Sequence, residues 1–366
     1  MLVSWERYRF SGLCFMLRSV ILAGFLLVSG FGGAVRSEEC PGNPDALGVS
    51  RLLPVSVKDG AIGTLSYKKT LDLKDHEVVL TFDDGPIARH TSAVLAALAH
   101  ECVKATFFTV GTMAVAYPQF LQQEAQAGHT IGTHTWSHQY LNRRHAEGSA
   151  ELQIAGGLHA AEVALGDRAS SLSPFFRFPG FGRTRALDQY VEDHGLVAVS
   201  VDIVGDDWLL ITPDQVLRRT LARLEQRGRG IVLLHDIHGR TAAMLPELLR
   251  ELKARNFHIV HMVADHDETA VALNSLPEPQ SPRFLVAMAR ARTRLAKLAL
   301  PDPAPVAAGL QPIEQILHVS GPDPVPSAEI EKIVNQRPIQ LARNGFSPAT
   351  NAPGGLTVLT SAELRR

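Results

Sequence analysis

Two adjacent carboxylates stand at the end of an apolar run that is typical of a buried strand. Residues 78–82 are mostly apolar without alternation, Asp83 and Asp84 follow, and Gly85-Pro86 marks a loop. Neighbouring carboxylates repel each other unless a cation is held beside them, so the pair indicates a metal site. The alternative is a turn in which an aspartate caps the next helix.

Two histidines four residues apart follow another predicted strand. On a helical turn, the spacing of His134 and His138 would point both imidazoles the same way. A pair at this spacing also arises by chance in a chain with 15 histidines. Because both segments follow strands, we expect one carboxylate and two imidazoles at the same edge of a sheet. This donor set suits a catalytic zinc ion.

Three further predicted strands end on ionisable side chains. Arg177 lies among phenylalanines and needs an anionic partner, for which the second carboxylate of the adjacent pair is the candidate. An exposed arginine is the alternative. The next two strands end on Asp206-Asp207-Trp208 and on His235-Asp236. Ionisable groups therefore gather at successive strand ends, which is where parallel α/β folds assemble active sites.

Apolar runs of strand length alternate with segments of helical period between residues 75 and 265, which predicts parallel strands joined by helices. We expect seven strands, at residues 78–82, 105–110, 130–133, 175–178, 196–201, 231–234 and 258–263. Six helices are expected between them, at residues 91–102, 113–127, 145–165, 184–194, 213–226 and 241–255. A single α/β barrel, closed or nearly so, fits this order better than an open sheet.

These ordered motifs resemble those of the polysaccharide deacetylase family, the NodB-homology domain of carbohydrate esterase family 4. The resemblance covers roughly residues 75–265, which it marks as the catalytic domain. It is carried by Thr-Phe-Asp-Asp-Gly at 81–85, His-Thr-Trp-Ser-His at 134–138, Arg-x-Pro at 177–179, Asp-Asp-Trp at 206–208 and Leu-Leu-His-Asp at 233–236. The resemblance implies a distorted (β/α)7 barrel and a divalent metal, usually zinc.

The resemblance also implies a role for each site residue. The metal ligands would be Asp84, His134 and His138. The catalytic residues would be Asp83 as general base, Arg177 to orient it, His235 as general acid, and Asp207 to orient and tune that histidine. The substrate pocket would be lined by Pro179, Gly180, Phe181, Trp208 and Leu233.

The chain departs from the family pattern at two places. The family reads Arg-x-Pro-aromatic-Gly, whereas here Gly180 precedes Phe181. The sequence therefore leaves open which backbone N–H at this turn would complete an oxyanion site. The Asp-Trp segment also carries an extra residue or two after Asp202. Neither departure removes a side chain that the reaction needs.

The resemblance implies a metal-dependent hydrolase that removes N-acetyl groups from GlcNAc residues of a polysaccharide and releases acetate. Peptidoglycan, chitin and chitooligosaccharides are the candidate substrates. The alternatives on the same scaffold are an esterase acting on O-acetyl xylan and a hydrolase of small amides. An inactive module that binds polysaccharide is a further alternative, although no ligand or base is missing.

The N-terminal part predicts export. Residues 1–37 combine arginines, an apolar run and small residues, which is typical of a secretory signal peptide and implies a periplasmic or secreted protein. An uncleaved membrane anchor is the alternative. Residues 38–74 would form an N-terminal extension. In an oxidising compartment Cys40 and Cys102 are candidates for a disulfide, the alternative being one buried and one free thiol.

The composition excludes little but is informative at the C-terminus. The net charge of −1 over 366 residues gives no indication of a nucleic-acid partner. Residues 271–366 hold 13 of the 22 prolines, without period, which predicts a largely disordered tail. Within it, residues 283–300 are rich in Ala, Leu and basic residues. They are expected to form a solvated helix or one in weak contact with a membrane or anionic envelope polymer.

Overall fold

The computed structural model describes residues 40–143 and 150–265, together with residues 276, 277, 284–286, 288–290 and 293. The predicted signal peptide and most of the predicted tail lie outside these residues. The described strands are β1 (Arg51–Val55), β2 (Glu77–Asp83), β3 (Thr106–Thr109), β4 (Thr130–Thr133), β5 (Leu172–Phe176), β6 (Val197–Ala198), β7 (Ile203–Val204), β8 (Gly230–His235) and β9 (His258–Ala264). The described α-helices are α1 (Ala88–His100), α2 (Gly111–Ala116), α3 (Pro118–Gln126), α4 (Ala150–Leu165), α5 (Arg185–Asp193), α6 (Pro213–Arg227) and α7 (Gly239–Ala254).

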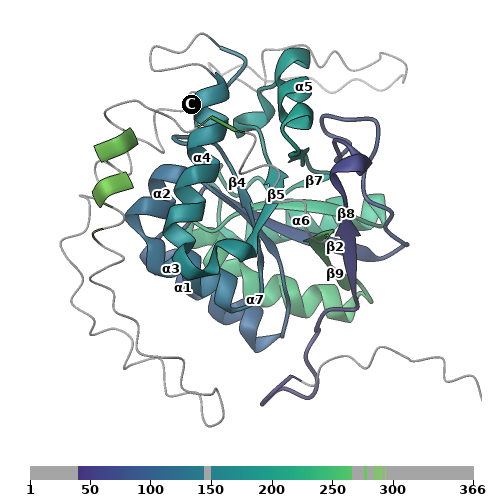
Figure 1. Cartoon of the computed structure of the whole chain (residues 1–366). Helices are drawn as coiled ribbons and strands as arrows, with labels where there is room; N and C mark the ends of the chain where they lie inside the picture. The colour runs from purple at the N-terminus through teal and green to yellow at the C-terminus, as the bar shows by residue number, and fades with distance from the viewer. Residues whose placement is uncertain are drawn as a thin grey trace, which may run out of the picture. The chain divides into compact units, whose positions relative to one another are not determined.

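The strands form one curled parallel sheet with β2 near its middle. From β2 the sheet continues through β3, β4, β5 and β6 on one side, and through β8 and then β7 on the other. The helices lie around the outside of this sheet (Figure 1). The structure confirms the prediction of a parallel α/β fold of the NodB barrel type.

Two apolar clusters explain why the strands are apolar on both faces. The larger cluster fills the space between the sheet and the helices, and it includes Leu80, Phe82 and Leu234. The smaller cluster lies on the other face of the same strands and includes Val79 and Leu233. Strands β2, β3, β4, β5 and β8 therefore bury both sets of their alternating side chains, as expected for parallel strands covered on two sides.

Local signals define the ends of the elements. In α6 the Thr212 side chain caps the Gln215 N–H, Pro213 occupies the first turn, and Gly228 ends the helix in the left-handed conformation. The expected helix at 113–127 is instead two helices, because Tyr117 leaves the helical conformation and Pro118 begins α3. The expected strand at 196–201 is only the two residues of β6, and the short β7 follows.

The predicted N-terminal extension belongs to the same sheet. β1 pairs in parallel with β9, which in turn pairs with the first residues of β2. Ile62 forms a bridge to Val199, accepting a hydrogen bond from Ser200 N–H. A disulfide joins Cys40 to Cys102 just after α1. The extension is therefore joined to residues 75–265 by strand pairing and by a disulfide.

Part of the predicted tail contacts the barrel. Phe284 and Met288 are buried against Val115 and Ala160, and Leu276 joins the larger apolar cluster. The expected helix within the tail is consistent with these contacts, because helical spacing places Phe284 and Met288 on one apolar stripe. The remainder of residues 271–366 lies outside the described part. No helix described for this chain is both long and apolar enough for a membrane span.

Candidate active site

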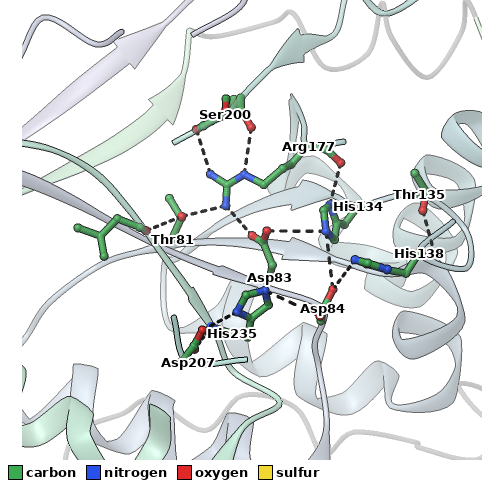
Figure 2. Close-up of polar contacts among 12 residues, drawn as sticks. Thr81, Asp83, Asp84, His134, Thr135, His138, Arg177, Ser200, Asp207 and His235 are labelled. Carbon is green, nitrogen blue, oxygen red and sulfur yellow. Dashed lines mark hydrogen bonds and ion pairs between the residues drawn. The ribbon is translucent and has the colours of Figure 1, made fainter. Parts of the chain in front are cut away.

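The predicted site residues meet at the carboxyl edge of the sheet, as Figure 2 shows. Asp83 is the last residue of β2, His235 is the last of β8, and His134 directly follows β4. Arg177 follows β5 at the same edge. Parallel strands place their carboxyl ends together, so residues about 150 positions apart become neighbours by fold alone.

Asp84, His134 and His138 form a group that can hold a metal ion. Their potential ligand atoms all lie within 4.8 Å of one another. Asp84 Oδ1 lies 3.1 Å from His138 Nε2 and 3.7 Å from His134 Nε2. One carboxylate and two imidazoles suit zinc and similar divalent cations, so the chemistry of the donors fits the predicted metal.

The two histidines meet across a turn and not along a helix, contrary to the spacing argument. Thr135 and His138 both adopt positive φ, at 67° and 58°. The Thr135 hydroxyl accepts a hydrogen bond of 3.0 Å from the His138 N–H. The ring centroids of His134 and His138 lie 4.8 Å apart at a steep angle. The turn at residues 135–138 therefore points both imidazoles the same way, which the sequence-based prediction attributed to a helical turn.

A backbone carbonyl sets the tautomer of His134. Its Nδ1 lies 2.7 Å from the Arg177 carbonyl oxygen, which can only accept, so Nδ1 carries the proton. Nε2 therefore presents its lone pair toward Asp84. Burial and the neighbouring His138 lower the pKa of His134 well below its usual value, which keeps the imidazole neutral. A neutral imidazole held by its other nitrogen is the form that ligates metals.

Arg177 is buried and paired with Asp83, so the alternative of an exposed arginine is wrong. Its Nη1 donates to Asp83 Oδ1 at 2.5 Å and to the Thr81 hydroxyl at 2.9 Å. Its Nε donates to the Val199 carbonyl, and its guanidinium lies 3.9 Å from the centre of the Phe108 ring. Burial raises the pKa of Asp83 to about 6, although Arg177 opposes that rise. The pair leaves Asp83 Oδ2 directed toward His134, 3.7 Å from its Nε2.

His235 is held by Asp207 on the opposite side of the site. Asp207 Oδ1 accepts from His235 Nδ1 at 2.7 Å, and Oδ2 accepts from the His235 N–H at 2.6 Å and from the Thr241 hydroxyl at 2.5 Å. Burial would lower the pKa of His235, but the Asp207 carboxylate, together with smaller effects of Asp84 and Asp83, raises that pKa to about 9. The free Nε2 lies 4.0 Å from Asp84 Oδ2. A protonated imidazole is thus aimed at the metal-binding group.

The turn at 180–181 has one backbone N–H available for a ligand. Gly180 and Phe181 both adopt positive φ, at 54° and 56°. Phe181 N–H donates to the Phe178 carbonyl and Gly182 N–H to the Pro179 carbonyl. Among the hydrogen bonds of the described residues, none uses the Gly180 N–H. Of these three neighbouring N–H groups, only that of Gly180 has no partner among the described hydrogen bonds.

The predicted pocket residues lie beside these groups. The Trp208 ring is 5.6 Å from the ring of His235. Leu233, on β8, is buried in the smaller apolar cluster, against which Phe181 and Trp208 also pack. Pro179 is buried at the start of the short 3-10 helix η3 (Pro179–Phe181). Apolar side chains thus border His235 and the turn at residues 180–181.

The structure adds two residues that the sequence argument did not assign. A Cβ on Gly180 would lie 1.9 Å from a ring carbon of Tyr140, so this ring closes directly over the turn. Asp236, fully buried, accepts a hydrogen bond from the Thr91 hydroxyl and lies against Gly85. The Leu-Leu-His-Asp motif already signalled Asp236, whereas nothing in the sequence pointed to Tyr140. Asp206 is excluded from the site, because Arg219 and Arg223 bind it from α6.

Comparison with known proteins agrees with this geometry. Residues 70–199 match the family model described as polysaccharide deacetylase. The chain is 30% identical over 210 residues to the peptidoglycan-N-acetylglucosamine deacetylase PgdA of Listeria monocytogenes, covering 57% of this chain and 41% of that protein. It is 30% identical over 196 residues to chitin deacetylase 1 of Saccharomyces cerevisiae, covering 51% of this chain and 61% of that protein.

A solved structure shares the fold. The peptidoglycan deacetylase Bd3279 of Bdellovibrio bacteriovorus superposes with a TM-score of 0.53 at 32% identity, covering 62% of this chain and 61% of that one. The chain thus spans about two fifths of the Listeria protein and about three fifths of the other two. Residues 70–199, which carry Asp83, Asp84, both histidines of the turn and Arg177, thus match the polysaccharide deacetylase family.

Proposed function

We propose that this protein is a metal-dependent deacetylase that hydrolyses the N-acetyl groups of GlcNAc residues in a polysaccharide and releases acetate. One observation carries the proposal. The Asp84–His134–His138 group lies between a carboxylate paired with Arg177 and a histidine paired with Asp207. The relatives are named as deacetylases of peptidoglycan and of chitin, which supports a glycan substrate. We propose zinc as the metal because the donors are two imidazoles and one carboxylate.

A divalent cation bound by these three ligands would polarise the acetyl carbonyl and lower the pKa of a bound water. Asp83 takes the proton from the attacking water, because its Oδ2 faces the metal-binding group while Arg177 holds Oδ1. The Gly180 N–H donates to the oxygen that becomes negatively charged. Asp83 is held by Arg177 and His134 by the Arg177 carbonyl, which favours little reorganisation of these side chains during the reaction.

His235 supplies the proton that the departing amine needs. An amine is a poor leaving group unless it is protonated, so the reaction requires an acid in addition to the metal. With a pKa raised to about 9, His235 carries that proton at neutral pH. Asp207 holds Nδ1, which leaves the Nε2 proton to be donated toward the site.

We also propose that the protein acts outside the cytoplasm. The Cys40–Cys102 disulfide supports this location, since such bonds persist mainly in oxidising compartments. We propose that the signal peptide at residues 1–37 directs this export.

Acetate release from a panel of acetylated glycans tests the proposal. The purified protein, with and without a chelator, would be given peptidoglycan, chitooligosaccharides and acetylated xylan. We expect release from at least one GlcNAc polymer or oligomer, loss of release with chelator, and recovery on adding zinc. Release from acetylated xylan alone would instead identify an O-acetyl esterase. Release that the chelator does not affect would contradict the metal assignment.

A further inference from the structure

A C-terminal side chain packs on the turn that carries the two histidines. Trp136 lies between His134 and His138, and its ring contacts Phe284 edge to face, with centroids 5.0 Å apart and planes at 70°. Phe284 is only 2% exposed, although it is about 150 residues away in sequence. Met288, one helical turn later, is 5% exposed in the same cluster.

The backbone of the histidine turn is held on two sides. The Trp136 N–H donates to the Gln153 carbonyl of α4, and its carbonyl accepts from the Thr112 N–H of α2. A Cβ on Gly111 would lie 2.8 Å from the Trp136 ring, so α2 closely contacts the indole as well. The C-terminal segment adds a further contact to the Trp136 side chain, through the ring of Phe284.

We infer that the C-terminal segment containing Phe284 and Met288 is a positioning element for the metal ligands. The Phe284 ring restricts rotation and tilt of the indole, which belongs to the turn between the two histidines. A displacement of a fraction of an ångström matters because ligand geometry tolerates deviations of only about 0.2 Å. The inference rests on the proposed function, since it takes His134 and His138 as metal ligands.

The apolar surface beneath the segment supports this role. Val115 of α2 and Ala160 of α4 belong to the cluster that Phe284 and Met288 cover. These two helices are also the ones that hydrogen-bond the Trp136 backbone. The segment therefore contacts both the indole and the helices that fix the turn, and it stabilises one arrangement of all three.

Zinc affinity of the full-length protein tests the inference, with competition against a chromophoric chelator as the measurement. Phe284→Ala removes the ring that contacts Trp136, and Leu285→Ala is the matched control because Leu285 is 42% exposed. We expect Phe284→Ala to weaken zinc binding by about tenfold, the lower end of the range for residues that orient ligands. Activity should fall at limiting zinc and recover with excess zinc. Leu285→Ala should match the unaltered protein.

Leu224→Ala separates positioning from general loss of stability. Leu224 is fully buried on α6, a helix that packs against α7, β7 and β8. This variant should lower the thermal midpoint while leaving zinc affinity unchanged. Zinc binding by Phe284→Ala at the strength of the unaltered protein would overturn the inference, as would an equal loss in Leu224→Ala. The zinc titration of the unaltered protein tests the proposed metal site separately. If the unaltered protein binds no zinc, the metal site itself is refuted.

Discussion

Two neighbouring aspartates have different environments because the backbone changes direction between them. Asp83 ends β2 in extended conformation and turns its carboxylate toward Arg177. Asp84 has a φ of 79°, a left-handed conformation uncommon for a non-glycine residue, and its carboxylate faces His138. Backbone strain of this kind is concentrated at functional sites. This change of direction would allow the two adjacent residues to act as base and as ligand in the proposed mechanism.

Substitution of each aspartate by asparagine should separate these two roles. Asp83→Asn keeps the size of the side chain and removes the proton acceptor, so zinc should remain bound while turnover falls by about 10²- to 10⁴-fold. Asp84→Asn should instead weaken zinc binding, with activity partly restored by excess metal. Elemental analysis and acetate release measure the two effects. Zinc lost from Asp83→Asn and kept by Asp84→Asn would mean that the roles are reversed.

The pH dependence of turnover should report the Asp207–His235 pair. Asp207 is the main group that raises the pKa of His235 to about 9, against the effect of burial. Asp207→Asn replaces this carboxylate with a neutral amide. The pKa of His235 should therefore fall, so that His235 loses its proton at lower pH. The basic limb of the kcat profile should therefore move to lower pH. Asp206→Asn is the control, because Asp206 pairs with arginines of α6. If Asp207→Asn leaves the basic limb unchanged, His235 is not the general acid.

At the scale of elements, the short helix η3 is shaped by the ring that covers it. Gly180 combines a φ of 54° with direct contact to Tyr140, so no other residue fits without movement. The Tyr140 ring thus occupies the space of a side chain at position 180, where the family pattern has an aromatic residue. The aromatic residue Phe181 follows instead and packs against the smaller apolar cluster.

Gly180→Ala should reduce kcat more than it alters KM. A left-handed alanine costs about 1–2 kcal/mol, and its methyl group would displace either Tyr140 or the turn, moving the N–H that faces the developing charge. Gly182→Ala is the comparison, since its φ is −76° and the side chain it approaches, Asn142, is exposed. Steady-state kinetics of both variants measure the difference. Equal kcat in Gly180→Ala and the unaltered protein would exclude this turn from catalysis.

At the scale of the whole molecule, both ends of the described chain are attached to the barrel. The disulfide ties Cys40 to the end of α1, and the Leu47 N–H donates to the Glu101 carboxylate next to it. β1 then adds to the sheet beside β9. At the other end, Phe284 and Met288 cover apolar side chains of α2 and α4. The stable unit therefore extends beyond residues 75–265 in both directions.

Breaking the disulfide should lower the free energy of unfolding. The bond joins residues 62 positions apart, and closing a loop of that length in the unfolded chain is worth about 4 kcal/mol. Chemical denaturation of the exported protein with and without reductant, and of a Cys40→Ser/Cys102→Ser variant, measures the loss. Both thiols should resist alkylation until reductant is added. Labelling of both cysteines in the native, unreduced protein would contradict the bond.

Truncations at two points should distinguish the parts of the C-terminal region. A chain ending at Leu300 keeps Phe284 and Met288 and should melt at the temperature of the full chain. A chain ending at Leu276 loses both side chains, and burial of each is worth about 2 kcal/mol, so its thermal midpoint should fall. Calorimetry of the two truncated proteins measures the shift. Equal midpoints would show that the contact adds no stability.

The sequence by itself determined the order of strands and helices and which residues stand at strand ends. Both follow from local chemistry, since apolar runs, helix caps and turn residues act over a few positions. Because parallel strands align their carboxyl ends, that order also predicted that Asp83, His134, Arg177 and His235 would meet.

Only the tertiary structure decided the contacts between segments distant in sequence. The turn that directs His138, the Tyr140 ring over Gly180 and the Phe284 ring on Trp136 depend on side chains from different elements meeting in three dimensions. The same is true of β1 in the sheet, because a five-residue strand becomes recognisable only once β9 lies beside it. Such contacts have no period or spacing in the sequence, since the free energy that selects them comes from packing between elements and not from the propensity of any one segment.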